Sequence, residues 1–234
     1  MTSEQDRDRG KRAAAARALE QVREGMTIGL GTGSTAAHFV ELRGERVHAG
    51  LGVRAIPTSS RTREQAARLG IKLVSFAETS RIDLTVDGAD EVDAQLRLVK
   101  GGGGALLHEK IVAAASDRFV VIADAQKEVA VLGTTMPLPV EVIPFGWQVV
   151  YRKLEPLGAH PVLRMSRAGQ PFLTDEGNHI LDCHFGAIVE PERIAAAIAG
   201  LPGVVEHGLF LGMADEVIFG DPSGDQTHVR SRNH

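Results

Sequence analysis

The sequence is poor in the features that mark several classes of protein. It has a single cysteine, Cys183, so no disulfide can form within the chain, which is typical of a reducing compartment. Its apolar runs all fall short of the roughly 18 residues that cross a membrane. Residues 1–11 are polar and charged and lack the apolar segment of a signal peptide. We therefore expect a cytoplasmic protein that binds no membrane.

Positive charge is not in excess either. Lysine and arginine number 26 against 30 aspartates and glutamates, which gives a formal net charge of −4. Without a basic field we expect no binding to nucleic acid, and local groups would have to hold an anionic ligand. The remaining composition, 43% hydrophobic and 24% charged, is ordinary for a globular protein, and 234 residues suffice for a full α/β core.

The first half of the chain alternates between helical and extended patterns. Apolar residues recur at helical spacing in some segments, and short apolar runs lie between these segments. The patterns predict helices at 4–24, from about 36, at 61–69 and at 105–115, and strands at 26–30, 53–56, 71–74, 82–86, 96–99 and 119–123. Strands that alternate with helices predict a parallel, doubly wound, Rossmann-like sheet.

From about residue 132 the order changes to β-α-β-β-α-β, which is that of the ferredoxin-like fold. Extended segments are predicted at 137–144, 162–165, 180–185 and 204–210, helices at 147–157 and 191–198, and a strand that returns to the first domain at 214–219. We therefore expect an α/β catalytic domain of residues 1–131 plus 206–234, with an inserted small ferredoxin-like α+β domain of residues 132–205. The polar tail from Asp221 is expected to be frayed.

A glycine-rich loop, Gly31-Thr32-Gly33-Ser34-Thr35, lies between a predicted strand and a predicted helix. Its N–H groups and hydroxyls, backed by the positive end of the helix dipole, would suit a phosphate. The loop lacks the lysine of a P-loop, and the glycine spacing differs from the dinucleotide fingerprint. The alternative is a tight turn in which Ser34 or Thr35 only caps the helix.

Three carboxylates, Asp87, Asp90 and Glu91, follow the predicted strand 82–86. They could move protons or hold a divalent metal. The alternative is a solvated cluster that caps a helix. The apolar strand before the cluster and the glycine run after it favour a functional role.

A metal site is disfavoured by the distribution of its usual ligands. The nine histidines are scattered, and His179 and His184 do not have the usual spacing of zinc ligands. Cys183 lies beside His184 in a predicted strand, so the two side chains point to opposite faces. We expect Cys183 to be a core residue rather than a nucleophile.

A run of four glycines, Gly101 to Gly104, follows Lys100 and the predicted strand 96–99. Each ordered glycine costs backbone entropy, so an economical structural turn would not use four of them. Glu109 lies five residues beyond the run and could be a general base near this loop. The alternative is a surface ion pair between Glu109 and Lys110, which would contribute little energy.

The candidate loops share one property, which is that each follows a predicted strand of the same parallel sheet. The carboxyl ends of such strands meet at one edge, where ligands bind. Lys127, after the predicted strand 119–123, could reach a phosphate there, although a solvated lysine is an equal alternative. The sequence therefore predicts an enzyme that moves protons on a phosphorylated small molecule.

Taken together, these residues resemble ribose-5-phosphate isomerase of the type A family. The resemblance covers the chain from about residue 11 to 220, and several motifs in the same order make it specific. The matching segments are Gly29 to Thr35, Asp87 to Glu91, Lys100 to Gly103, Glu109-Lys110, Ile122 to Ala125 with Lys127, Pro137 to Pro144, Asp175 to Asn178, Pro202 to Val205 and Gly208 to Phe210. Gly104 departs from the pattern, in which alanine is more usual, and His108 stands at a variable position.

The resemblance implies a reaction and roles for particular residues. It implies metal-independent interconversion of D-ribose 5-phosphate and D-ribulose 5-phosphate through an enediolate, without a cofactor, by a homodimer or homotetramer. Glu109 corresponds to the base, and Asp87, Asp90 and Lys100 to residues that assist ring opening and hold hydroxyls. The implied substrate-binding positions are Lys11, Thr32, Gly33, Ser34, Thr35, Asp87, Gly88, Ala89, Asp90, Lys100, Gly101, Gly102, Gly103 and Lys127.

Two other classes share this kind of fold. Sugar-phosphate-sensing modules of bacterial repressors bind phosphosugars without turning them over, but this chain has no N-terminal DNA-binding helices and keeps the carboxylates and the lysine. Coenzyme A transferases use a glutamate as nucleophile. The length of 234 residues and the absence of a recognisable acyl-CoA site argue against them.

Overall fold

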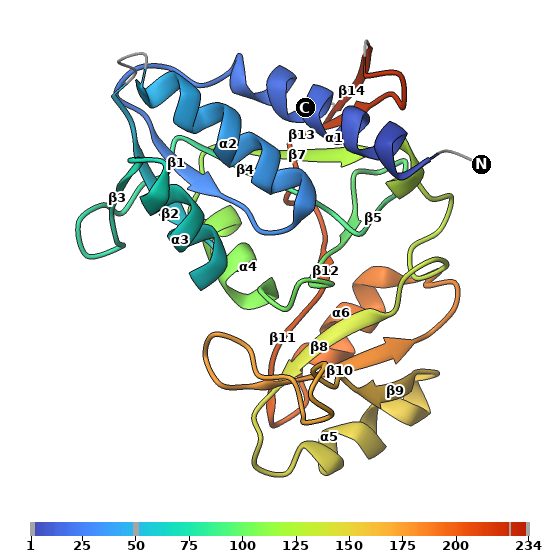
Figure 1. Cartoon of the computed structure of the whole chain (residues 1–234). Coiled ribbons are helices and arrows are strands. Elements are labelled where there is room, and N and C mark those ends of the chain that lie inside the picture. Colours follow the sequence, from blue (N-terminus) through green and yellow to red (C-terminus); the bar gives the residue numbers. More distant parts are fainter. Residues whose placement is uncertain (1–2, 49–51, 225, 233–234) are drawn as a thin grey trace. The chain divides into compact units, whose positions relative to one another are not determined.

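A computed structural model describes residues 3–48, 52–224 and 226–232 of the chain (Figure 1). The chain divides into two units, each with a sheet of its own. The first unit consists of Met1–Ala89, His108–Lys127 and Met213–His234, and the second of Asp90–Leu107 and Glu128–Gly212. No helix in the described ranges is both long enough and apolar enough to cross a membrane.

The first unit is built on a seven-stranded sheet in the order β14-β13-β7-β4-β1-β2-β3. Neighbouring strands are parallel throughout, except that β14 runs antiparallel to β13 at the edge. The strands are β1 (Thr27–Leu30), β2 (Arg54–Pro57), β3 (Lys72–Leu73), β4 (Leu84–Asp87), β7 (Phe119–Asp124), β13 (Glu216–Gly220) and β14 (Thr227–Ser231). The central strands β1, β4 and β7 are buried along their whole length, as strands covered on both faces must be.

Helices cover both faces of this sheet. The main core of the unit joins one face to apolar side chains of α1 (Glu4–Leu19), α2 (Ser34–His48) and α3 (Ser60–Arg68). A smaller core on the opposite face includes Ile56 of β2 and Val112 of α4 (Leu106–Ala114). Ala55 and Ile56 therefore face opposite helical layers, and the expected doubly wound fold is confirmed.

Local capping explains where two of these helices begin. Ser3 precedes α1 and forms a reciprocal capping box with Asp6, and the Ser59 hydroxyl accepts the Thr62 N–H at the start of α3. The helix expected at 4–24 ends earlier, at Leu19. Val22 instead packs into the core from the turn that follows.

The C-terminal tail is ordered, so the prediction that it is frayed is wrong. Residues 227–231 form β14 and pair with all five residues of β13. The reason is that β13 would otherwise expose an unpaired edge of the sheet, which the polar tail closes without needing an apolar sequence of its own.

The second unit contains a four-stranded antiparallel sheet in the order β11-β8-β10-β9. Its elements in chain order are β8 (Leu138–Val142), α5 (Trp147–Leu154), η2 (Glu155–Leu157), β9 (His160–Leu163), β10 (His179–His184), α6 (Pro191–Ala199) and β11 (Val204–His207). Numbered within the motif, the strand order is 4-1-3-2. The predicted ferredoxin-like motif is confirmed.

A third, three-stranded sheet belongs to the second unit, in the order β12-β6-β5. Its strands are β5 (Glu91–Val92), which the sequence did not reveal, β6 (Leu98–Val99) and β12 (Leu209–Phe210). Because these strands pair with one another, Asp90–Leu107 groups with the second unit rather than the first. The expected division into domains at residues 131/132 and 205/206 stays a prediction.

Candidate active site

Asp87, at the carboxyl end of β4, is the centre of the candidate site in the first unit. Its side chain is fully buried, and Oδ1 accepts hydrogen bonds from the N–H groups of Thr32 at 3.0 Å and Gly88 at 2.7 Å. A Cβ at Gly31 would lie 2.1 Å from the same oxygen. Glycine is therefore required at position 31, because it lets the backbone after β1 approach the carboxylate of the neighbouring strand.

The predicted phosphate loop leads directly into α2, which begins at Ser34. Gly33 has a φ of 112°, in the left-handed region, and is exposed together with Ser34, whereas Thr35 is buried. Lys11 comes from α1, and its ammonium donates to the Ser34 hydroxyl at 3.1 Å. A helix N-terminus, a hydroxyl and a cation thus meet at one place, which suits an anion.

A chain of hydroxyl groups supports this loop from α3, and the sequence did not single it out. The Thr32 hydroxyl lies 2.8 Å from that of Ser59, which donates to Thr62 at 3.0 Å, and Thr62 donates to the Gly31 carbonyl at 2.9 Å. The Thr58 hydroxyl also lies 2.7 Å from that of Thr32. The support of the loop by this cluster depends on the pairing of β1 with β2, which brings the residues after β2 beside the loop after β1.

Glu109 lies in the first turn of α4, in the same unit as Asp87 and Thr32. Its side chain is only 4% exposed. That burial excludes the alternative of a solvated surface pair with Lys110. A buried carboxylate near a helix N-terminus is a suitable general base, since its surroundings hold it in place.

Lys127 ends the 3₁₀ helix η1 (Ala125–Lys127), directly after β7. Because β7 neighbours β4, this residue follows the strand adjacent to the one that carries Asp87. Lys127 and Ala89 are both partly buried. The proposed contact of Lys127 with a phosphate stays a prediction, as does its alternative as a solvated lysine.

The second unit carries the other candidate residues. The Gly102 N–H donates to Asp90 Oδ2 at 2.7 Å, and a Cβ at Gly102 would lie 2.8 Å from the other carboxylate oxygen. Lys100 is buried, and its ammonium lies 5.5 Å from the centre of the Phe210 ring, within range of a cation–π interaction. Gly101 is buried with a φ of 103°, and Gly102 and Gly103 are exposed.

The predicted strand 96–99 does not belong to the parallel sheet, so the prediction that the glycine run follows one of that sheet's strands is wrong. Lys100 follows β6, which pairs antiparallel with β5 and β12 and is not a strand of the seven-stranded sheet. The run 96–99 was too short and too buried for its partner strands to be recognised from the sequence. The residues of the second unit are therefore brought together by the three-stranded sheet and not by the parallel one.

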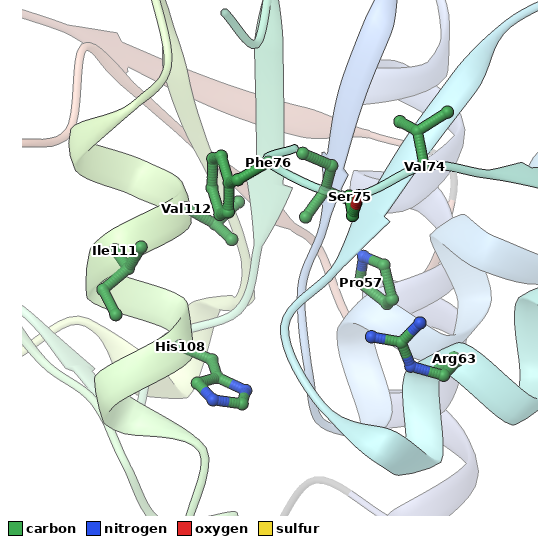
Figure 2. Close-up of a pocket in the computed structure, with 9 residues that line it drawn as sticks. Pro57, Arg63, Val74, Ser75, Phe76, His108, Ile111 and Val112 are labelled. Atoms are coloured by element: carbon green, nitrogen blue, oxygen red, sulfur yellow. The ribbon is translucent and has the colours of Figure 1, made fainter. Parts of the chain in front are cut away.

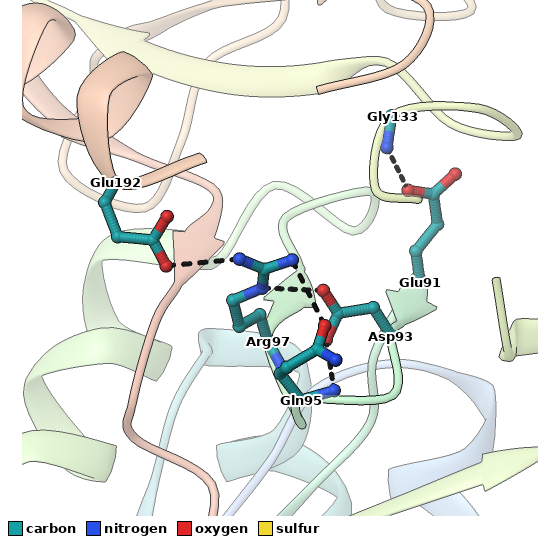
Figure 3. A network of polar contacts seen from close by, with 6 residues as sticks. All are labelled: Glu91, Asp93, Gln95, Arg97, Gly133 and Glu192. Atoms are coloured by element: carbon teal, nitrogen blue, oxygen red, sulfur yellow. Dashed lines mark hydrogen bonds and ion pairs between the residues drawn. The ribbon is translucent and has the colours of Figure 1, made fainter. Parts of the chain in front are cut away.

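Glu91 has a structural role, although its position beside Asp90 suggested chemistry. Its carboxylate is fully buried and accepts hydrogen bonds from the N–H groups of Gly133, Thr135 and Met136 and from the Thr135 hydroxyl. With four hydrogen bonds to its two oxygens, it fixes the turn before β8. Figure 3 shows the Glu91–Gly133 contact beside a second network, in which Arg97 bridges Asp93 and Glu192.

The remaining reactive groups do not form a second centre. Within the described ranges, no three side chains of the histidine, cysteine, aspartate and glutamate types are grouped so as to hold a metal ion. Cys183 is fully buried in β10, as predicted, and burial raises the pKa of its thiol. It is a core residue and not a nucleophile.

A cavity of about 240 Å³ that was not predicted lies in the first unit, between α4, β2 and the segment 74–76 that follows β3 (Figure 2). Its walls are mostly apolar, and Arg63 and His108 supply the basic groups among its lining residues. His108 immediately precedes Glu109 on α4. No carboxylate lines the cavity, so it offers no base for proton transfer.

Comparison with known proteins gives concordant results over nearly the whole chain. The family model described as ribose 5-phosphate isomerase A (phosphoriboisomerase A) matches residues 54–224. A protein of Rhodopseudomonas palustris (strain BisB5), named ribose-5-phosphate isomerase A, is 55% identical over 232 residues, which are 97% of this chain and 100% of the relative. The protein of the same name from Gloeobacter violaceus is 58% identical over 220 residues, 94% of this chain and 95% of the relative.

Solved structures agree with the sequence relatives. A D-ribose-5-phosphate isomerase in complex with phospho-erythronic acid has a TM-score of 0.91 and 39% identity, covering 95% of this chain and 97% of the other. The ribose 5-phosphate isomerase of Plasmodium falciparum also has a TM-score of 0.91, at 35% identity, covering 96% of this chain and 98% of the other.

Proposed function

The chain belongs to the ribose 5-phosphate isomerase A family, and we propose that Glu109 is the base with which it interconverts D-ribose 5-phosphate and D-ribulose 5-phosphate. It is an aldose–ketose isomerase of the non-oxidative branch of the pentose phosphate pathway. The observation that carries the assignment of the base is the burial of Glu109, 4% exposed, in the unit that also holds the anion-binding loop and Asp87.

The phosphate of the substrate is held by the loop Thr32–Thr35, with Lys11 and Lys127 as cations. The contact between the Lys11 ammonium and the Ser34 hydroxyl supports this placement, because it brings a positive charge to the N-terminus of α2. Binding the end of the sugar that does not react helps to align the carbons that do.

Glu109 removes the proton from C2 of the open-chain aldose, and the electron pair moves through the C1–C2 bond to O1. The resulting cis-enediolate receives that proton at C1, and the proton of the O2 hydroxyl passes to O1 as O2 becomes the ketone oxygen. One carboxylate thus serves as base and then as acid, and no atom is gained or lost. Asp87, Asp90 and Lys100 assist opening of the furanose ring and hold the hydroxyls.

The negative charge that develops on the enediolate needs donors that are already in place. Lys100 and the N–H groups of Gly101, Gly102 and Gly103 are proposed for this task, together with Gly88 and Ala89 for binding. The burial of Lys100 supports its part, because a charge acts more strongly where water is excluded. A lysine in that position would supply the positive charge that a divalent cation provides elsewhere, so we propose a reaction independent of metals and cofactors.

We further propose that the enzyme acts in the cytoplasm as a homodimer or homotetramer. Large apolar side chains with high exposure, such as Phe145 at 89% and Val189 at 77%, support association between copies. Sedimentation equilibrium at several concentrations would give the mass of the species in solution. A strictly monomeric species would contradict this part of the proposal.

The reaction is tested by incubating the protein with ribose 5-phosphate in deuterated water. An isomerase that works through an enediolate yields ribulose 5-phosphate with deuterium at C1, to the extent that the proton on Glu109 exchanges with solvent. The same incubation with a chelator tests independence from metals, for which an unchanged rate is expected. Binding of the sugar without formation of any ketose would instead identify a phosphosugar-sensing module.

A further inference from the structure

Arg164 follows β9 and has no part in the assignments above, but it contacts the glycine loop. Its guanidinium forms a two-pronged ion pair with Asp182 of β10, with Nε 2.9 Å from one carboxylate oxygen and Nη2 2.5 Å from the other. It also lies over the Phe172 ring, 5.8 Å from the ring centre. Held by these two neighbours, the guanidinium has little freedom to move.

The remaining nitrogen of Arg164 is directed at the loop backbone. Nη1 donates to the carbonyl of Gly101 at 2.9 Å and lies 3.2 Å from that of Gly102. Two successive peptide carbonyls therefore point toward one cation. A run of glycines has no side chains to select a single backbone conformation, so a contact of this kind determines how its peptide planes face.

The orientation of the carbonyls fixes the orientation of the N–H groups. The described peptide bonds are all trans, and in a planar trans peptide the N–H points opposite to the C=O. The N–H groups of Gly102 and Gly103 must then point away from Arg164. The Gly102 N–H does so, since it donates to Asp90 at 2.7 Å. The Gly103 N–H is turned toward the same side by the same geometry.

Phe172 contacts both Gly104, at the end of the loop, and Arg164. Gly104 has a φ of 83°, and a Cβ there would lie 2.5 Å from Cζ of Phe172. The phenyl ring thus packs against Gly104 and also lies in contact range of the guanidinium of Arg164. The positive φ and the close packing together account for the glycine at position 104.

We propose that Arg164 is a positioning residue, which holds the Gly102 N–H on Asp90 and turns the Gly103 N–H toward the substrate so that it meets the oxyanion of the enediolate. The inference rests on the proposed reaction and assigns to Arg164 a role in the transition state rather than in binding. Its positive charge also polarises the two peptide groups, which strengthens their N–H groups as donors.

The test compares Arg164→Ala and Arg164→Lys with Arg193→Ala, which removes an arginine from an exposed ion pair with Glu190 in the same unit. For Arg164→Ala we expect kcat to fall roughly 100-fold, since misplaced catalytic groups cost about this much. KM for ribose 5-phosphate should change less than about threefold, because ground-state binding is retained. Arg164→Lys should also lose rate, since an ammonium cannot bind Asp182 and two carbonyls together. Arg193→Ala should match the wild type.

Two further measurements separate positioning from a general loss of structure. Added guanidinium ion should restore part of the rate of Arg164→Ala and none of that of Arg164→Lys. Binding of phospho-erythronic acid, whose carboxylate resembles the enediolate, should weaken by about the same factor as kcat, since both report the transition state. Binding of inorganic phosphate should not change. Equal losses for phosphate and phospho-erythronic acid, with no rescue, would overturn the inference.

The loop itself can be followed without any reaction, by amide hydrogen exchange. Arg164→Ala should lose protection at the Gly102 N–H, and Arg193→Ala should keep it. A wild-type protein that forms no ribulose 5-phosphate would refute the proposed function, whatever the exchange shows. A wild-type isomerase whose Arg164→Ala and Arg164→Lys variants both keep full kcat and full protection would refute only the role of Arg164.

Discussion

The Lys11 ammonium lies 3.1 Å from the Ser34 hydroxyl, although 23 positions separate the two residues in the chain. The contact joins the middle of α1 to the first residue of α2 and brings a cation to an exposed helix N-terminus. It gives a structural reason for the proposed part of Lys11 in binding phosphate, which its helix sequence alone could not provide.

Replacing Lys11 by methionine should weaken binding of phosphorylated sugars and leave the chemical step nearly intact. A hydrogen bond to a charged group contributes about 1.5–3 kcal/mol, so KM should rise roughly 10- to 100-fold while kcat changes little. Steady-state kinetics and competition with inorganic phosphate would measure this. The control is Arg12→Met on the same helix, whose side chain is half exposed. An unchanged KM for Lys11→Met would remove this residue from the phosphate site.

Replacing Glu109 by glutamine should abolish turnover and spare substrate binding. A positioned base contributes about 10²- to 10⁴-fold, and the neutral amide has the shape of the carboxylate but cannot take a proton. Turnover would be measured by deuterium incorporation into ribulose 5-phosphate. Substrate binding would be measured by calorimetry with ribose 5-phosphate. Glu64→Gln, at an exposed position on α3, is the matched control. A near-native rate in Glu109→Gln would show that another group is the base.

Replacing Gly31 by alanine should destabilise the first unit and lower activity. The added Cβ would lie 2.1 Å from Asp87 Oδ1, and relief of such overpacking costs about 1–3 kcal/mol of unfolding free energy. Urea denaturation measures the change. Gly200→Ala serves as the control, because its φ is −78° and the nearest atom would be 3.6 Å from the new Cβ. Equal stabilities for both variants would mean that the β1–β4 contact relaxes freely.

The thiol of Cys183 should be unreactive in the native protein. Burial raises its pKa, so the reactive thiolate is absent at neutral pH and the sulfur has no access to solvent. A disulfide reagent that releases a coloured thiol should not label the native protein. After denaturation it should label the single cysteine. Rapid labelling of the native protein would indicate that β10 opens locally.

Most of the fold followed from the sequence because its elements carry local signals. The helical spacing of apolar residues and the buried runs of β1, β4 and β7 act over a few residues, and periodicity reveals them. Two elements carried no such signal. The tail β14 is polar, and β5 is only two residues long, so each is defined by its partner strand alone.

The sequence by itself determined the two-part α/β and ferredoxin-like architecture, the core position of Cys183 and the residue types available for proton transfer and anion binding. Only the tertiary structure decided that Glu109 is buried, that Glu91 is structural, and that Lys11 and Arg164 reach loops that lie far from them in the chain. The physical reason is that periodicity reports which side of an element is buried, whereas the pairing of distant side chains depends on how whole elements pack.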